Sequence, residues 1–307
     1  MRTYRSFGLA LLSSLFMIWS TPSEAIRLIR DAEVEHALKR LAAPVLSQAG
    51  LPANRIKIML VDNRAMNAFV IDSQHIFIYT GLIGRLKTAG ELQAVIAHEA
   101  AHIANGHIAR RKGNYGAARN AGAFGMLLAI GVAAAGAGDA AIGIAAGTQS
   151  AAQRAYFAHS RAEEASADRA ALRYMSRAQI PTTAMVDLME LFRGQEALSS
   201  NRQDAYVLTH PLSRDRLRAI KAHASASSSN FKPNTSAEAA FATVQGKISA
   251  FLRPARWTLS RVKKTDKSNL AIMRRAVAYH RQPSPKKALK EINKLVADAP
   301  KIRLPMS

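Results

Sequence analysis

The spacing of apolar residues predicts a chain built mostly from helices. Long segments place apolar residues three and four positions apart, which is the period of a helix buried on one face. Short segments within 56–60 and 67–79 alternate and predict two or three short strands. The strands are too short for a doubly wound sheet, so we expect an α+β fold that is predominantly helical, with a small β-sheet. The predicted helices cover residues 31–49, 90–112, 160–178 and 182–194.

The C-terminal part of the pattern predicts a small helical appendage. Residues 223–245 are rich in Ser, Ala, Asn and Thr, a composition typical of a linker. Within 246–307, two amphipathic helices are expected at 271–280 and 286–297, separated by two prolines. This pair resembles a single tetratricopeptide-type (TPR-like) hairpin. Because one repeat cannot bury its apolar face alone, partner binding through this tail is left open.

The N-terminus predicts export. Residues 1–25 combine a basic start, an apolar run too short to span a bilayer comfortably, and small residues at Ser23 and Ala25. We expect a cleavable signal peptide, a mature chain that begins at Ile26, and location in a bacterial periplasm. An uncleaved anchor is the alternative.

A second apolar segment, residues 121–147, is long enough to cross a membrane. Its glycines and alanines contribute little hydrophobicity, and Asp139 near its centre disfavours insertion. We expect a pair of helices that packs on the domain or lies against a membrane surface, with a membrane span as the alternative.

Composition limits the catalytic groups and the binding partners that are possible for this chain. The chain has no cysteine, which excludes thiolate nucleophiles, disulfides and cysteine-rich metal sites. Its formal net charge is +22, and residues 246–307 hold sixteen Lys and Arg against three Asp and Glu. The export signal and the absence of a recognisable binding motif argue against nucleic acid. Attraction to an anionic membrane surface or to an acidic partner is more consistent with export.

The candidate chemistry begins with His98-Glu99-Ala100-Ala101-His102 in the predicted helix 90–112. Histidines four residues apart lie on one helical face, so their ring nitrogens can converge on one ion. Glu99 falls beside that face, where it can reach a metal-bound water without binding the metal. The pattern predicts a zinc hydrolase site. His107 falls on a different face of this predicted helix, so we expect a structural role for it.

An acidic cluster in the predicted helix 160–178 offers the third ligand. Glu164 and Asp168 are four residues apart and share a face, flanked by small alanines. The simplest assignment makes Glu164 a metal ligand and Asp168 the carboxylate that orients a ligand histidine. Taken alone, the cluster is equally consistent with an ordinary solvated group of charges.

Together these motifs resemble the gluzincin zinc metalloproteases of peptidase family M48, especially its periplasmic members. The match covers roughly residues 28–222. It includes H-E-x-x-H, the later Ser-Arg-x-x-Glu-x-x-Ala-Asp at 160–168, the strand-like segments before the motif helix, and Thr209-His210-Pro211 followed by Arg216. The resemblance implies a helical zincin domain over 26–222.

The resemblance also assigns the site residues. It implies one Zn²⁺ per chain held by His98, His102 and Glu164, the latter in preference to Glu163. Glu99 becomes the general base that deprotonates the zinc-bound water and later protonates the leaving amine. His210 either gates the open position or assists the oxyanion, with a structural role as the alternative. Arg216 is expected to pair with a site carboxylate or a substrate carbonyl.

The function implied is that of an exported zinc endopeptidase acting on unfolded or misassembled envelope proteins. Two alternatives stay open. One is a chaperone-like binding module in which His210 keeps the zinc site closed and the tail contacts the envelope assembly machinery. The other is a membrane-anchored processing protease with 121–147 as its anchor. The oligomeric state is not determined by these patterns.

Overall fold

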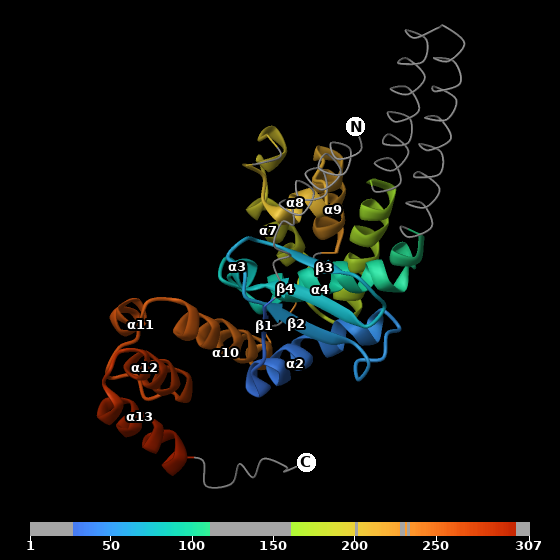
Figure 1. The fold of residues 1–307 in the computed structure, drawn as a ribbon. Coiled ribbons are helices and arrows are strands. Elements are labelled where there is room, and N and C mark those ends of the chain that lie inside the picture. Colours follow the sequence, from blue (N-terminus) through green and yellow to red (C-terminus); the bar gives the residue numbers. More distant parts are fainter. Residues whose placement is uncertain (1–26, 111–160, 200–201, 228–230, 232–233, 299–307) are drawn as a thin grey trace, which may run out of the picture.

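The computed structural model describes residues 27–110, 161–199, 202–227, 231 and 234–298 (Figure 1). The predicted signal peptide and the apolar segment 121–147 lie outside the described residues. Among the helices of the described part, none is both long enough and apolar enough to cross a membrane.

A four-stranded sheet lies at the centre of the fold, in the order β1-β2-β4-β3. The parallel pair β2–β4 forms its middle, and β1 and β3 add antiparallel at the two edges. The two predicted strand regions are confirmed, whereas β1 is too short to leave a pattern in the sequence. The strands are β1 (Leu28–Ile29), β2 (Lys57–Val61), β3 (Ala68–Val70) and β4 (His75–Tyr79).

Alternation along the strands divides the sheet into two faces. Ile58, Ile76 and Ile78 point to the face that forms the main core. Helices α2 (Ala32–Gln48) and α4 (Ala89–Ala104) pack on this face. On the opposite face Phe69 stacks on Phe77, with ring centroids 5.2 Å apart. The remaining helices of this part are α3 (Thr80–Ile83), a helix over residues 161–177, α7 (Thr183–Leu191), the 3-10 turn η1 (Gln195–Ala197), α8 (Ala205–Thr209) and α9 (Arg214–Ala226).

Helix α4 is shorter than its apolar pattern predicts. It ends at Ala104 instead of continuing to residue 112, and the chain is helical again over residues 107–110. The break occurs at Gly106, whose φ of 68° is a left-handed conformation that favours glycine.

The N-terminus of α4 is capped from two directions. The Thr88 hydroxyl accepts a hydrogen bond from the Glu91 backbone N–H, which is the local cap expected from sequence. The second cap comes from far along the chain, since the Glu238 carboxylate accepts the Ala89 N–H at 3.1 Å. A carboxylate at this end also complements the helix dipole.

The predicted linker 223–245 is wrong over most of its length. Helix α9 continues to Ala226, and α10 (Thr235–Leu252) begins with Asn234 as its N-cap. Helix α10 packs on α2 and α4, and Phe241 and Val244 belong to the main core. The alanines that suggested a linker are good helix formers, and the apolar residues between them supply a buried face.

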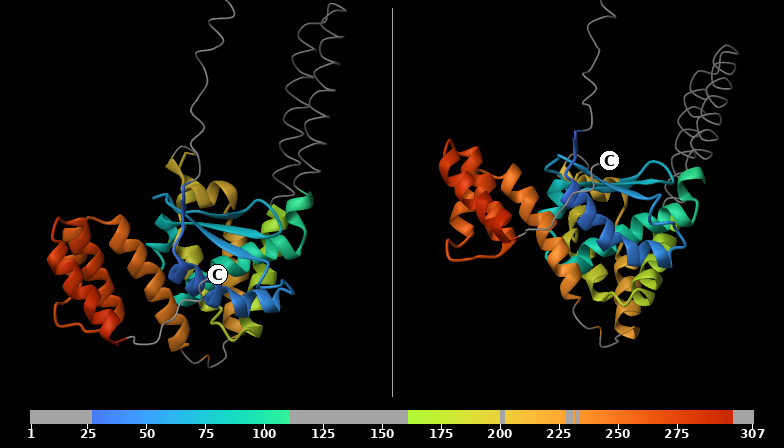
Figure 2. Two further views of the ribbon diagram at one scale, coloured as in Figure 1. Left: turned by 60° about the horizontal axis from the view of Figure 1, so that its bottom comes forward. Right: turned by 90° about the horizontal axis from the view of Figure 1, so that it is seen from below.

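The C-terminal helices α11 (Ala255–Arg261), α12 (Asn269–Arg281) and α13 (Pro285–Asp298) form a group beside the sheet-containing part, reached through α10 (Figures 1 and 2). Helices α12 and α13 pack together as the predicted hairpin, and a buried ion pair joins Arg275 to Glu291 at 3.0 Å. Leu289, Ile292 and Val296 form an exposed apolar stripe on α13. The likeness to a tetratricopeptide repeat remains a prediction.

We predict that Gly81→Ala destabilises the fold by about 1–3 kcal/mol. A Cβ at Gly81 would overlap the carbonyl oxygens of Arg64 and Ala65, and backbone atoms cannot move aside cheaply. Urea unfolding monitored by circular dichroism measures the change. Gly84→Ala is the matched control, because its Cβ would meet nothing closer than 3.5 Å. Equal unfolding midpoints for the two variants would contradict the prediction.

Candidate metal centre

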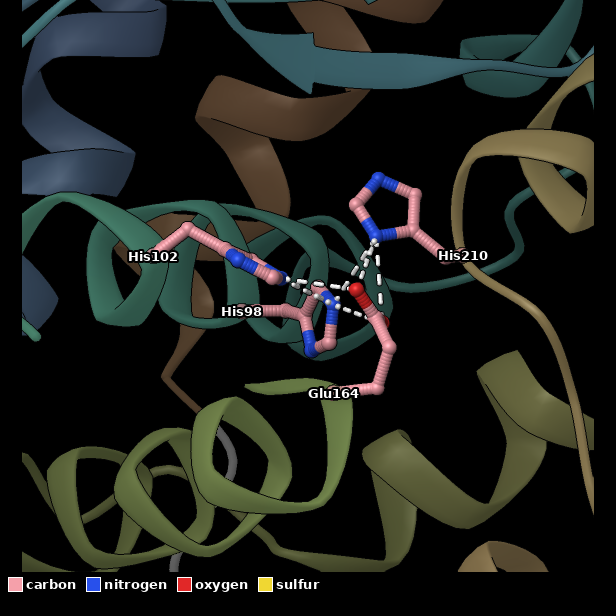
Figure 3. Close-up of side chains that lie close together, drawn as sticks. All are labelled: His98, His102, Glu164 and His210. Atoms are coloured by element: carbon pink, nitrogen blue, oxygen red, sulfur yellow. Dashed lines mark hydrogen bonds and ion pairs between the residues drawn. The ribbon is translucent and has the colours of Figure 1, made fainter. Parts of the chain in front are cut away.

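Helix α4 places the H-E-x-x-H residues inside the core. His98, Glu99 and His102 are 0%, 0% and 1% exposed. Figure 3 shows both imidazoles directed toward Glu164, which projects from the helix 161–177, and toward His210, which follows α8. Two predicted ligands from one helix therefore meet a third from a helix more than sixty residues later in the chain.

The candidate ligand atoms are close together. The Nε2 atoms of His98 and His102 are 3.1 Å apart. Glu164 approaches with Oε2 at 3.1 Å from His98 Nε2 and Oε1 at 3.3 Å from His102 Nε2. Together with His210, these residues offer ligand atoms that all lie within 4.8 Å of one another, and all four side chains are buried. Glu163 instead lies 3.7 Å from Arg110, as an ion pair.

This donor set fits zinc. Tetrahedral zinc with bonds of about 2.0–2.1 Å separates its ligand atoms by about 3.3 Å, and the observed contacts match that spacing. Imidazole nitrogens and a carboxylate are ligands that zinc prefers. Among the described residues this is the one cluster of potential ligands with such geometry.

The protonation of the cluster is uneven. Burial alone would lower the pKa of His98, but the Asp168 and Glu164 carboxylates raise it to about 10. Burial and the positive charge on His98 lower the pKa of His102 to about 3. Burial would raise the pKa of Glu164, yet the adjacent imidazoles hold it well below its usual range. A metal ion would therefore take the place of a proton on His98.

Asp168 and Arg216 support the cluster from behind. Asp168 Oδ1 lies 3.1 Å from His98 Nδ1, on the side of the ring opposite Nε2. Arg216 donates to the same carboxylate through Nε at 2.7 Å and Nη2 at 2.8 Å. Its Nη1 donates to the Pro211 carbonyl at 2.7 Å and lies 3.2 Å from Glu164 Oε2. Despite burial, Arg216 and His98 lower the pKa of Asp168 to about 2.

The His210 ring lies between the candidate ligands and Glu99. Its Nδ1 is 3.2 Å from both Glu164 oxygens and 3.3 Å from His98 Nε2. Its Nε2 is 3.4 Å from Glu99 Oε1 and 3.2 Å from the Ala68 carbonyl oxygen on edge strand β3. The imidazole is thus in contact with the candidate ligands on one side and with the Glu99 carboxylate on the other.

Helix α8 holds His210 in this place. The Tyr206 N–H donates to the Met66 carbonyl at 3.0 Å, and the Thr209 hydroxyl donates to Asn67 Oδ1 at 3.2 Å. The Tyr206 ring also lies against His210, with centroids 4.7 Å apart. Burial and the nearby Glu99 carboxylate hold the pKa of Tyr206 well above its usual range.

Glu99 is a buried carboxylate without a hydrogen bond from the described residues. Burying a polar side chain without hydrogen-bonding partners costs free energy, and such groups in folded proteins often have a catalytic role. Its Oε1 lies 3.4 Å from His210 Nε2, so the carboxylate is adjacent to the histidine that contacts the candidate ligands.

The predicted placement of His107 on a different helical face is wrong, whereas its expected structural role stays a prediction. A continuous helix would direct it away from the ligands, but the break at Gly106 turns it back. Its Nδ1 lies 3.0 Å from His102 Nδ1, and the side chain is 1% exposed. The Asn-Gly pair at 105–106 was the available sequence signal, because it marks a helix end.

Comparison with known proteins agrees with this geometry. Residues 29–224 match the family described as Peptidase family M48. The Beta-barrel assembly-enhancing protease of Escherichia coli O157:H7 is 28% identical over 195 residues, which cover 62% of this chain and 39% of that protein. The protein of the same name from Yersinia pestis is 25% identical over 214 residues, which cover 66% of this chain and 43% of that protein. The chain therefore spans less than half the length of these curated relatives.

Proposed function

Because the chain belongs to peptidase family M48, a family of zinc metallopeptidases, we propose that it is an exported endopeptidase that hydrolyses misfolded or misassembled envelope proteins. The observation that carries this proposal is the buried convergence of His98, His102 and Glu164, with the Glu99 carboxylate beside them.

The residues divide the chemistry between them. Zinc held by the two histidines and Glu164 would supply Lewis acidity to the attacking water and the scissile carbonyl. Glu99 takes the proton from that water and returns it to the leaving amine. Asp168 orients the His98 ring, and Arg216 holds Asp168 while balancing the negative charge of Glu164.

We assign His210 the role of a gate. A catalytic zinc site needs one position open to water, whereas four protein ligands close the shell. His210 Nδ1 is as far from Glu164 and His98 as two ligands of one zinc ion are from each other. Its Nε2 lies beside the Glu99 carboxylate. Substrate would enter once α8 releases from residues 66–68 and carries the ring outward. An oxyanion-stabilising role would require the ring to lie off the ligand cluster.

The gate predicts that His210→Ala increases the rate of casein degradation by the purified, zinc-loaded chain. The increase equals the reciprocal of the fraction of time for which the parent is open, so a site open about a tenth of the time gains about tenfold. Thr209→Val, which removes the hydroxyl that bonds Asn67, should increase activity in the same direction by less. Thermal melting of each variant checks the fold. A loss of activity in folded, zinc-loaded His210→Ala would contradict the gate and favour oxyanion stabilisation.

Substrates and location are proposals from the relatives. The names of the matched proteins refer to β-barrel assembly. Unfolded or misassembled envelope proteins in the periplasm are therefore the proposed substrates. The basic α11–α13 group is the proposed contact with the membrane surface or the assembly machinery.

A second function, that of an assembly-binding module, is favoured by one observation. The His210 ring closes the cluster, so binding without hydrolysis is compatible with this arrangement. The two functions separate in cells, because a Glu99→Gln chain would retain the function of a binding module and would lose that of a protease.

A further inference from the structure

The two histidines of the H-E-x-x-H motif differ in what supports their second ring nitrogen. His98 Nδ1 faces the Asp168 carboxylate at 3.1 Å. His102 Nδ1 faces another imidazole, Nδ1 of His107, at 3.0 Å. We propose that His107 is a positioning residue for the metal centre, which accepts a hydrogen bond from His102 and holds its ring in the metal-binding orientation. This inference rests on the proposed zinc site.

The direction of the bond follows from the ring chemistry. His102 Nε2 faces Glu164 and His98, so its lone pair must be free for a metal. A neutral imidazole with a free Nε2 lone pair carries its proton on Nδ1. His102 therefore donates through Nδ1, and His107 Nδ1 accepts. Fixing that proton fixes the tautomer that can bind zinc.

The backbone conformation at Gly106 brings His107 next to His102. In an uninterrupted helix, five residues correspond to a rotation of about 140°, which would separate the two side chains. The left-handed Gly106 ends α4 and starts a new helical turn, so the two rings meet edge to face with centroids 4.9 Å apart. Asn105 Nδ2 donates to the Ser166 hydroxyl at 3.3 Å, which ties this turn to the helix that carries Glu164.

Burial protects the His102–His107 contact from competition by water. Both rings are 1% exposed, so water does not readily replace either partner. Loss of a group that orients a ligand histidine typically weakens metal binding by about 10- to 100-fold. The same range is expected here if the contact acts by orienting His102.

The experiment compares His107→Leu with His107→Asn. Leucine fills space but accepts no hydrogen bond, whereas the asparagine carbonyl oxygen can stand near the position of Nδ1. Zinc affinity is measured by competition with a chromophoric chelator, on the parent and both variants, and the thermal midpoint of each metal-free protein is recorded. We expect zinc affinity to fall about 10- to 100-fold in His107→Leu and to stay within a few-fold of the parent in His107→Asn.

The outcomes distinguish the proposed metal site from the proposed role of His107. A parent that binds no zinc would overturn the proposed metal site itself. A parent that binds zinc, with His107→Leu binding equally well, would overturn only the positioning role. Equal losses of affinity in both variants, accompanied by equal drops in the metal-free midpoint, would make His107 a packing residue and would also overturn it.

Discussion

Replacing Glu99 by glutamine is expected to lower the kcat of peptide hydrolysis by about 10²- to 10⁴-fold while zinc remains bound. The amide has the shape of the carboxylate but cannot accept a proton from water. Glu99 is not one of the four residues whose ligand atoms converge, so the substitution should leave the metal content unchanged. Hydrolysis of a fluorogenic peptide, measured in both the parent and the His210→Ala background, gives kcat for an open site.

Glu91→Gln is the matched control for this prediction. Glu91 lies on the same helix and is also buried, but it bonds the Lys87 backbone at the opposite end from the ligands. Burial raises the pKa of Glu91, and the side-chain carbonyl oxygen of a glutamine can accept the same hydrogen bond from the Lys87 N–H. If Glu99→Gln keeps the kcat of the parent with full zinc content, another group must act as the base.

Replacing Arg216 by methionine is expected to destabilise the metal-free protein by about 3–5 kcal/mol. Arg216 is 5% exposed and neutralises two buried carboxylates, those of Asp168 and Glu164. Without it, these groups lose their buried guanidinium partner, and desolvation is no longer offset. Urea unfolding in the presence of a chelator measures the change without a contribution from bound zinc.

Arg218→Met is the control, because the Arg218–Asp215 pair is exposed and should contribute about 0–1 kcal/mol. The double variant Arg216→Met/Asp168→Leu should recover part of the loss, since it removes the unpaired charge as well. A loss below about 1 kcal/mol for Arg216→Met would contradict the role assigned to the pair.

The Asp168–Arg216 pair also predicts a pH dependence. The pKa of Asp168 is lowered from 3.8 to about 2 in the folded protein. Its contribution to stability is therefore fully present above pH 3.8 and is lost as the pH falls through about 2. The parent should lose stability over this interval, and Arg216→Met should lose less.

Local patterns determined much of the fold. The helical period predicted α2, α4 and the α12–α13 hairpin, and the alternating segments predicted β2, β3 and β4. These predictions succeed because the spacing of apolar residues along a helix or strand depends only on that element having one buried face. The same reasoning failed at residues 235–245, where alanine-rich sequence around a cap residue is compatible with either a linker or a buried helix.

The candidate ligands were also accessible from sequence, because His98 and His102 share a face within one helix and Glu164 matched a family motif. Their surroundings were accessible only in part. The sequence motifs predict that Asp168 orients a ligand histidine and that Arg216 pairs with a site carboxylate or a substrate carbonyl. That His107 lies against His102 depends on the break at Gly106. That the partner of Arg216 is Asp168, and that His210 lies between Glu99 and Glu164, depends on how separate elements pack.

The sequence by itself therefore determined most of the helices and strands, because their periods follow from neighbours within a few turns. It also supplied the candidate zinc ligands, two from their spacing in one helix and one from a family motif. Tertiary structure alone decided the contacts between distant segments. Glu238 caps α4 from α10, and residues 66–68 hold α8 over the cluster. The physical reason is that such contacts depend on the relative position of packed helices and strands, which no local period encodes.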